Sequence, residues 1–242
     1  MTDHSGEDGY AVNAQYYDLI FPAEQRGRIT AGLRALLSGS DRIAEVGSGT
    51  GLFTSVLLEL LSTEGELFAI EPSAVMRAAL VTRLASLDDP PVTVLPHDAV
   101  TADVPEPLDA VVMLHMLTHL VDVDRQAAWH HWVPRLRPGG LVITDEQIPQ
   151  EPTDIPPSVV PGRSLGRRRY DTVTQARIDG DGMVWTITYR VHEANALVTQ
   201  DTVSFPSVVV SQATLDAELR AVGCEPVPDA PDGIWAWRKP SA

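Results

Sequence analysis

The chain has 242 residues, a formal net charge of -15 and a hydrophobic fraction of 44%. A chain of this length can bury one substantial core, so we expect one main domain with an elaboration. The negative charge argues against nucleic acid as a partner, because contacts with phosphates need a basic face. Its single cysteine, Cys224, excludes an internal disulfide framework and a cysteine-based zinc site.

The sequence offers no sign of membrane targeting. Residues 1–9 are polar and acidic, without the apolar run of a signal peptide. No stretch reaches the ~18 apolar residues that are needed to span a bilayer. We therefore expect a cytoplasmic protein that does not bind membranes.

The first elements lead into a glycine-rich loop. Residues 10–20 form a mixed segment with three tyrosines and little periodicity. Pro22 suits the first turn of a helix, and apolar residues recur at helical spacing from Ile29 to Leu37. Residues 42–46 are then predicted as a buried strand, which runs into three alternating glycines at residues 47–51.

The glycine loop predicts a site for a nucleotide-like ligand. Glycine has no Cβ and tolerates positive φ, so the backbone can approach a ligand closely. We expect a helix over residues 54–62, whose N-terminal amides and positive dipole end would point at that ligand.

Strands and helices alternate in the next hundred residues. Strands are predicted at residues 67–70, 92–95, 108–114 and 141–144, and helices at residues 73–84 and about 124–136. Pro134 must kink or end the second helix, and residues 137–140 are expected to form a turn. This alternation indicates an α/β fold with a parallel sheet and right-handed crossovers.

The pattern changes after residue 146. Residues 147–163 are proline-rich and are interpreted as a loop. Three segments rich in Thr, Val, Trp and Tyr then predict strands at residues 171–178, 183–192 and 197–205. Asp-Gly-Asp-Gly at residues 179–182 predicts a hairpin turn. Strands with such short connections cannot be parallel, so we expect a small antiparallel β insertion.

The end of the chain returns to the main pattern, with a helix over residues 211–222 and strands near residues 224–227 and 233–238. The predicted domains are an N-terminal helical lid segment (1–40), a cofactor-binding Rossmann-like domain (41–150 and 206–242) and an antiparallel β lid insertion (151–205).

Ligands of open α/β sheets bind at the carboxyl ends of the strands, and distinctive residues follow several predicted strands here. Glu71 follows Gly51 by twenty residues, where a carboxylate can accept both hydroxyls of a ribose. A dinucleotide fingerprint that starts at Gly47 would need glycine at position 52, which is Leu52. This spacing disfavours a nucleotide-dependent oxidoreductase, which stays as a secondary alternative.

The motif Glu45-x-Gly-x-Gly-x-Gly, together with Glu71, Asp98 and the Arg-Pro-Gly-Gly run at residues 137–140, resembles the class I S-adenosylmethionine-dependent methyltransferases. The resemblance implies a doubly wound, Rossmann-like sheet of seven strands, mostly parallel, with the last strand antiparallel. The β insertion and the tyrosine segment further resemble small-molecule members, such as glycine and amino-sugar N-methyltransferases.

The resemblance also implies how S-adenosyl-L-methionine would be held. Gly47, Ser48 and Gly49 would approach the methionine part through their backbone, with Glu45 near its ammonium group. Glu71 would hold the ribose hydroxyls; the alternative is a solvated loop carboxylate.

On the adenine side, the resemblance implies that Met76 packs on the base and that Asp98 accepts a hydrogen bond from its amine, with Ala99 beside it. Leu114 and His115 would close the far side of the cofactor. The alternatives are core packing for Met76 and Leu114, and a solvated carboxylate for Asp98.

Tyr16 and Tyr17 match the tyrosine segment of these relatives. We expect them to close over the sulfonium, Tyr16 as a cofactor contact and Tyr17 at the catalytic end. A cation beside aromatic faces gains about 0.5–2 kcal/mol. The alternative is that one tyrosine belongs to the core and the other to a helix surface.

Methyl transfer is a direct displacement, and much of its acceleration can come from alignment. An alcohol acceptor also needs a general base, for which His115 and His119 are candidates. Asp145 and Glu146 follow the fifth strand and are expected to orient an amine or hydroxyl of the substrate. No cluster of metal ligands is visible in the sequence.

The sequence therefore favours an S-adenosylmethionine-dependent methyltransferase that modifies a nitrogen or oxygen of a small molecule in natural-product biosynthesis. The alternative is a cofactor-binding protein of the same fold that catalyses a rearrangement or cyclisation without methyl transfer. A non-enzymatic interaction module is disfavoured, since it would not need several strand ends suited to a ligand. The edges of the β insertion could support a homodimer.

Overall fold

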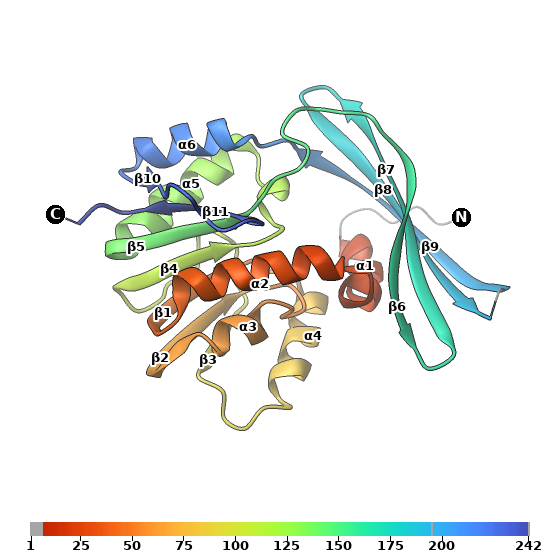
Figure 1. The fold of residues 1–242 in the computed structure, drawn as a ribbon, viewed down its shortest axis with the longest axis horizontal. Helices are drawn as coiled ribbons and strands as arrows, with labels where there is room; N and C mark the ends of the chain where they lie inside the picture. The colour runs from red at the N-terminus through yellow and green to blue at the C-terminus, as the bar shows by residue number, and fades with distance from the viewer. Residues whose placement is uncertain (1–6, 195, 242) are drawn as a thin grey trace.

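The computed structural model describes residues 7–194 and 196–241 and contains two β-sheets (Figure 1). The strands of the larger sheet are β1 (Ser40–Val46), β2 (Leu61–Ile70), β3 (Val92–Leu95), β4 (Leu108–Met113), β5 (Leu136–Asp145), β10 (Glu225–Pro226) and β11 (Ile234–Arg238). The smaller sheet is formed by β6 (Ile155–Leu165), β7 (Arg168–Asp179), β8 (Gly182–Glu193) and β9 (Ala196–Val208). The helices are α1 (Glu7–Ile20), α2 (Ala23–Leu37), α3 (Thr54–Leu58), α4 (Ala74–Leu84), α5 (Asp122–Trp132) and α6 (Gln212–Ala221), with short 3-10 turns η1 (Leu117–His119) and η2 (Val133–Arg135).

The larger sheet has seven strands in the order β10-β11-β5-β4-β1-β2-β3. Its central pairs are parallel, whereas β11 runs antiparallel to both β5 and β10. Apolar residues of α5 and α6 pack on one face of the sheet, and those of α2, α3 and α4 pack on the other. The predicted doubly wound, mostly parallel α/β fold is confirmed. Helices cover both faces of the sheet because β1 and β4 are apolar on both faces.

Some elements differ in their bounds from the predicted ones. The helix that follows the glycine loop ends at Leu58, and β2 already begins at Leu61. Residues 137–140 lie within β5, where the pairing with β4 shifts register and Gly139 has φ +80°. Pro134 follows the end of α5, as expected for a residue that cannot continue a helix.

The mixed tyrosine segment is a helix, α1, which lies between the two sheets (Figure 1). Val12 and Tyr16 pack with Tyr189, Val191 and Val203 of the smaller sheet. Tyr17, on another side of the helix, packs with the core of the larger sheet. Because α1 is covered from more than one side, its apolar residues do not follow a single face, and the helical period is hidden in the sequence.

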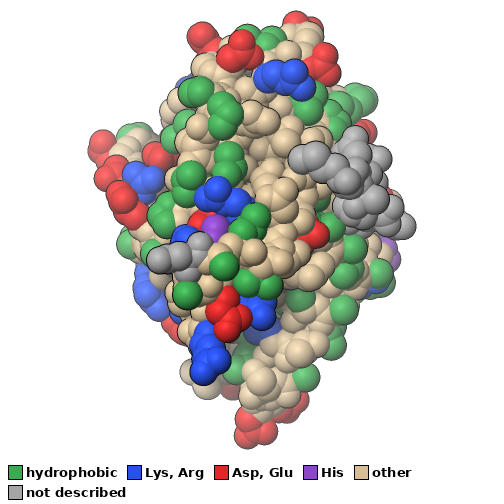
Figure 2. All heavy atoms as spheres, turned by 90° about the vertical axis from the view of Figure 1, so that its right-hand side faces the viewer, with side chains coloured by type: hydrophobic (Ala, Val, Ile, Leu, Met, Phe, Trp, Pro, Cys, Tyr) green, Lys and Arg blue, Asp and Glu red, His purple; other side chains and the backbone are tan. Residues whose placement is uncertain are grey.

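The proline-rich segment that we interpreted as a loop contains a fourth strand, β6, so the smaller sheet begins at Ile155. Pro156, Pro157 and Pro161 are tolerated because β6 is the edge strand in the order β6-β7-β8-β9. This sheet is antiparallel throughout, as predicted for the insertion. The side of the molecule that it forms exposes neutral polar and backbone atoms interspersed with hydrophobic and charged side chains (Figure 2).

No helix in the described part of the chain is long and apolar enough to cross a membrane.

Candidate active site

The loop between β1 and α3 depends on its three glycines. Gly47, Gly49 and Gly51 have φ values of +78°, +57° and +82°. A Cβ at Gly47 would lie 2.9 Å from the Cβ of Met116, while a Cβ at Gly49 would enter open space. Positive φ disfavours any L-residue with a side chain, so glycine keeps the loop backbone exposed to a ligand.

This loop forms one wall of a cavity of about 220 Å³ at the carboxyl ends of β1, β2 and β4. The cavity brings together most of the residues singled out in the sequence, namely Tyr17, Glu45, Gly47, Ser48, Gly49, Glu71, Met76, Asp98, Ala99, Leu114, His115 and His119. It is also lined by residues that sequence reasoning missed, among them Tyr10, Asn13, Phe53 and Met116. We call it the cofactor cavity.

Glu71 holds the two sides of the cofactor cavity together. Its Oε2 accepts the Gly49 N–H at 2.8 Å, and its Oε1 accepts the Ser73 N–H at 2.8 Å. Burial raises the pKa of Glu71, and these two N–H donors act in the opposite direction. The carboxylate therefore connects the glycine loop to the start of α4, where Ser73 caps the helix.

Glu45, the penultimate residue of β1, carries a buried carboxyl group and is only 3% exposed. Its Oε2 accepts the hydroxyl of Thr54 at 2.5 Å. Burial raises the pKa of Glu45 to about 8, with a further contribution from the charge of Glu71. A cation beside Glu45 would reverse this shift, because an opposite charge favours the ionised carboxylate.

Asp98 lines the end of the cofactor cavity that follows β3. Its Oδ1 accepts the Val100 N–H at 2.9 Å and the Thr101 hydroxyl at 2.8 Å, and these hydrogen bonds lower the pKa of Asp98. Met76 and Ala99 are buried nearby, at 5% and 9% exposure. This end of the cavity therefore combines an ionised carboxylate with apolar walls.

His115 has the most constrained geometry in the site. Its φ is +54°, and its N–H donates to Asp145 Oδ1 at 2.9 Å. Its Nδ1 lies 3.3 Å from Asp145 Oδ2, and its ring packs edge-on against Phe21. Its Nε2 is buried without a hydrogen-bond partner within the described ranges. Asp145 therefore holds the ring from one side, and no described side chain engages Nε2 on the other.

His119 is the second histidine of the site and lies in η1. Its ring centroid is 6.3 Å from that of Tyr10 and 5.8 Å from that of Phe205. Burial lowers the pKa of His119, so the ring is neutral at pH 7. It can therefore accept a proton or pack against an apolar group.

The two tyrosines of α1 face different surroundings. Tyr17 lines the cofactor cavity, whereas Tyr16 stacks on Tyr189 at 4.7 Å and donates to Asp201 Oδ2 at 2.5 Å. Consecutive helical residues point about 100° apart, and here Tyr17 faces the cavity while Tyr16 faces the smaller sheet. The expected contact of Tyr16 with the cofactor is therefore corrected, because Tyr16 joins α1 to the smaller sheet.

Helix α1 is tied to the glycine loop by side chains that the sequence did not single out. Asp18 Oδ1 accepts the Thr50 hydroxyl at 2.6 Å, and Arg83 forms an ion pair with Asp18. Arg83 Nε also donates to the Thr50 carbonyl at 3.0 Å. These contacts fix Tyr17 relative to the loop.

A second cavity of about 360 Å³ lies between α1, β5 and the smaller sheet. Its walls include Asp145 and Glu146, with Trp185 and Tyr189 from the smaller sheet. It shares four residues with the cofactor cavity: Asn13, Tyr17, His115 and His119. We call it the acceptor cavity. Within the ranges that the structure describes, no group of three or more His, Cys, Asp or Glu residues could hold a metal ion.

The seven-stranded sheet with its antiparallel end, the glycine loop after β1 and the acidic residue after β2 define the class I methyltransferase fold. Residues 44–142 match the family described as a methyltransferase domain. The chain therefore has the fold of the class I S-adenosylmethionine-dependent methyltransferases, and residues 44–142 are similar to a methyltransferase domain.

Curated relatives agree with this assignment. An uncharacterised methyltransferase of Geobacillus kaustophilus is 28% identical over 142 residues, which are 56% of this chain and 60% of the relative. One of Anoxybacillus flavithermus is 32% identical over 102 residues, which are 42% of this chain and 44% of the relative. The chain thus spans less than two thirds of the length of the curated relatives it matches.

Solved structures resemble the chain over its whole length. The sugar N-methyltransferase KedS8 from Streptoalloteichus has a TM-score of 0.74 at 20% identity and covers 100% of this chain and 97% of its own. The amino pentose methyltransferase CalS10 from Micromonospora echinaspora, of calicheamicin biosynthesis, has a TM-score of 0.71 at 18% identity, with 99% of both chains covered. At these identities the likeness establishes the fold alone.

Proposed function

We propose that this chain transfers the methyl group of S-adenosyl-L-methionine to a nitrogen or oxygen of a small molecule. The observation that carries the proposal is the junction of two cavities. The cofactor cavity and the acceptor cavity share Asn13, Tyr17, His115 and His119. A methyl donor in one cavity would therefore face an acceptor in the other, and a direct displacement requires this arrangement.

Residues of the cofactor cavity suit the methionine and ribose parts of S-adenosylmethionine. Gly47, Ser48 and Gly49 would offer backbone groups to the methionine part. Glu45, whose pKa is raised to about 8 by burial, would ionise beside the ammonium group. Glu71 would accept the ribose hydroxyls while it keeps its hydrogen bond with the Gly49 N–H.

At the other end, Asp98 would accept a hydrogen bond from the adenine amine. Met76, Ala99 and Leu114 would enclose the base, which matches their low exposure. Bound in this direction, the cofactor would supply an electrophilic methyl group at the junction near Tyr17.

The acceptor would be activated at the same junction. Because Asp145 faces His115 Nδ1, the proton of the neutral ring is favoured there, and Nε2 is left as the base. Glu146 would orient the acceptor from the same strand end. Two carboxylates at one wall of the acceptor cavity favour an amine as the methylated group.

Isotope transfer tests the proposal. Cofactor with a labelled methyl group is incubated with the chain and a panel of small amines and alcohols, and label is expected in an amine product with release of S-adenosylhomocysteine. Label that stays in the cofactor while the acceptor is rearranged would support the alternative, a rearrangement or cyclisation. Binding of NADH without binding of S-adenosylmethionine would reject both.

The role of His115 has its own test. With the acceptor found in that assay, His115→Ala is expected to lower turnover about 100-fold, as for loss of a general base. Cofactor affinity should change less than threefold. His119→Ala should have a smaller effect, and His130→Ala on the exposed side of α5 is the matched control. Unchanged turnover in both His115→Ala and His119→Ala would leave only alignment as the source of catalysis.

The setting of the reaction is part of the proposal. CalS10 acts in calicheamicin biosynthesis. We propose that this chain also acts in natural-product biosynthesis, in the cytoplasm. The fold, the β insertion and the acidic acceptor cavity support this extension.

A further inference from the structure

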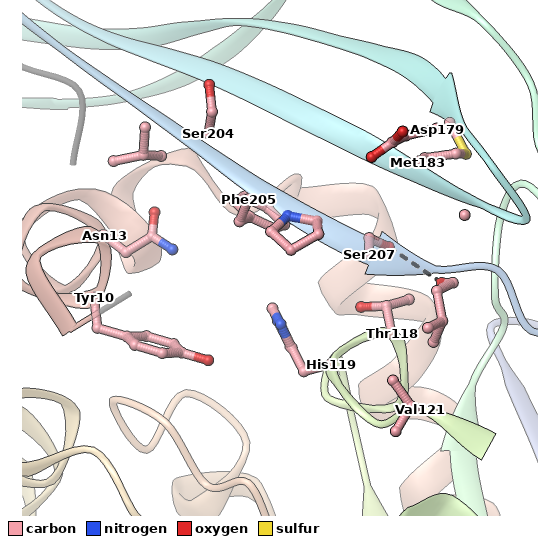
Figure 3. Close-up of a pocket in the computed structure, with 15 residues that line it drawn as sticks. Tyr10, Asn13, Thr118, His119, Val121, Asp179, Met183, Ser204, Phe205 and Ser207 are labelled. Carbon is pink, nitrogen blue, oxygen red and sulfur yellow. Dashed lines mark hydrogen bonds between the residues drawn. The ribbon is translucent and has the colours of Figure 1, made fainter. Parts of the chain in front are cut away.

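A third cavity opens beside the acceptor cavity, with a volume of about 500 Å³. It lies between the start of α1, the segment around η1 and strand β9 (Figure 3). Asn13, Thr118, His119 and Phe205 line both this cavity and the acceptor cavity. We call it the antechamber, because its shared walls make it continuous with the place where the acceptor would be methylated.

The walls of the antechamber are mainly apolar. Val203, Phe205 and Val208 come from β9, and Val121 follows η1 on the other side. Figure 3 shows His119, from the segment around η1, pointing toward Phe205 of β9. The ring centroids of these two side chains are 5.8 Å apart. Aromatic and aliphatic walls of this kind recognise an apolar or aromatic group, since burial of such a group is favourable.

The charges of both cavities have one sign. The acceptor cavity contains Asp145 and Glu146, and the antechamber contains Asp179. Among the described residues that line the two cavities there is no lysine or arginine. Residues 1–6, which lie outside the described ranges, contain none in the sequence either. A phosphate or carboxylate here would lose its hydration without gaining a cation.

We propose that the acceptor is a cationic amine joined to an apolar or aromatic group, and that it carries no phosphate. This inference rests on the proposed function. The amine would lie in the acceptor cavity near Glu146, and the apolar group in the antechamber against Phe205. A sugar that is still attached to a nucleoside diphosphate is therefore excluded as the acceptor.

Probe binding tests the proposal in the presence of S-adenosylhomocysteine. The probes are 4-phenylbutylamine, n-butylamine and 4-phenylbutyl phosphate, titrated by calorimetry. Burial of the phenyl group should make 4-phenylbutylamine bind about tenfold more tightly than n-butylamine, which corresponds to about 1.4 kcal/mol. The phosphate should bind at least tenfold more weakly than the matching amine. Equal affinity of the two amines, or tighter binding of the phosphate, would overturn the proposal.

Three variants test which residues cause the tighter binding of the phenyl-bearing amine and the weak binding of the phosphate. Phe205→Ala, with Phe205→Leu as a milder change, should remove the advantage of the phenyl group while the affinity for S-adenosylhomocysteine stays unchanged. Thr118→Arg supplies the missing cation and should raise the affinity for 4-phenylbutyl phosphate at least tenfold. Leu197→Ala, at a half-exposed position of the same strand, is the matched control. A phenyl advantage that survives in Phe205→Ala would contradict the antechamber.

Failure of the proposed function gives a different result. Each amine is also titrated without S-adenosylhomocysteine. If S-adenosylhomocysteine does not bind but the affinities of the two amines still differ tenfold, the antechamber proposal is supported and the methyltransferase proposal is rejected. If the nucleoside binds but the amines do not differ, the antechamber alone is rejected.

Discussion

Replacing Glu71 by alanine is expected to weaken the binding of S-adenosylhomocysteine at least 100-fold. In the proposed complex the carboxylate accepts the ribose hydroxyls, and each hydrogen bond to a charged group contributes about 1.5–3 kcal/mol. Two such bonds amount to at least 3 kcal/mol, and 1.4 kcal/mol is a factor of ten in affinity. The alanine variant also loses the hydrogen bond that the Gly49 N–H donates to Glu71 Oε2, which orients the glycine loop.

Calorimetric titration measures this effect, and circular dichroism verifies that the variant is folded. Glu66→Ala is the matched control, since Glu66 lies on β2, the strand that precedes Glu71, and forms a partly exposed ion pair with Arg42. Its affinity for the nucleoside should not change. Binding within threefold of the unaltered chain in Glu71→Ala would show that Glu71 is a solvated loop carboxylate, the alternative that the sequence left open.

Binding of S-adenosylhomocysteine is expected to strengthen at least tenfold as pH rises from 6 to 8. In the free protein, burial raises the pKa of Glu45 to about 8, so the carboxyl group is protonated through most of this range. The ammonium group of the ligand would favour the ionised form, and binding would then release a proton. Affinity increases with pH until the free carboxyl group is itself ionised.

Glu45→Gln should weaken binding above pH 8 and remove this pH dependence. The ligand 5′-methylthioadenosine, which has no amino-acid part, should bind the unaltered chain with little dependence on pH. Burial lowers the pKa of His119, so its titration lies toward the acid side of this pH range, whereas that of Glu45 lies at the upper end. A pH dependence that persists in the Gln variant would assign the titration to another group.

The carboxyl group of Glu45 also contributes to the pH dependence of the free energy of unfolding in the absence of ligand. The unfolded chain loses the Glu45 proton near pH 4.5, whereas the folded chain keeps it to about pH 8. Between these values the folded state binds more protons, so the contribution of Glu45 to the free energy of unfolding falls as pH rises. Thermal unfolding should therefore show Glu45→Gln to be more stable than the unaltered chain at pH 8, and the difference should shrink at pH 5.

Elements with a regular apolar pattern could be predicted from the sequence, and those that depend on a distant partner could not. The parallel strands were identified because β1 and β4 are apolar on both faces. Helix α1 lies within the predicted helical segment 1–40, but its helical phase could not be read, since Val12, Tyr16 and Tyr17 pack against different parts of the molecule. Strand β6 was missed because prolines normally argue against a strand, and only its position at the sheet edge allows them.

The cofactor cavity was predictable in outline. Parallel strands bring their carboxyl ends to one edge, so the glycine loop, Glu71 and Asp98 had to lie near one another. The residues that α1 contributes to the cavity were harder to predict, since the sequence did not show which side of this helix faces the glycine loop. Asn13 and Tyr10 were therefore missed, and Tyr16 was placed in the cavity in error.

Short-range spacing by itself determined the fold class, the glycine loop and the acidic residue after β2, because these features depend on local backbone geometry and strand order. Only the tertiary structure decided that Asp145 holds His115, that Glu45 is buried enough to stay protonated, and that the antechamber has no lysine or arginine in its described walls. These properties arise where α1 and the smaller sheet close over the strand ends. Burial and charge at such a junction depend on residues far apart in the chain, which no local pattern records.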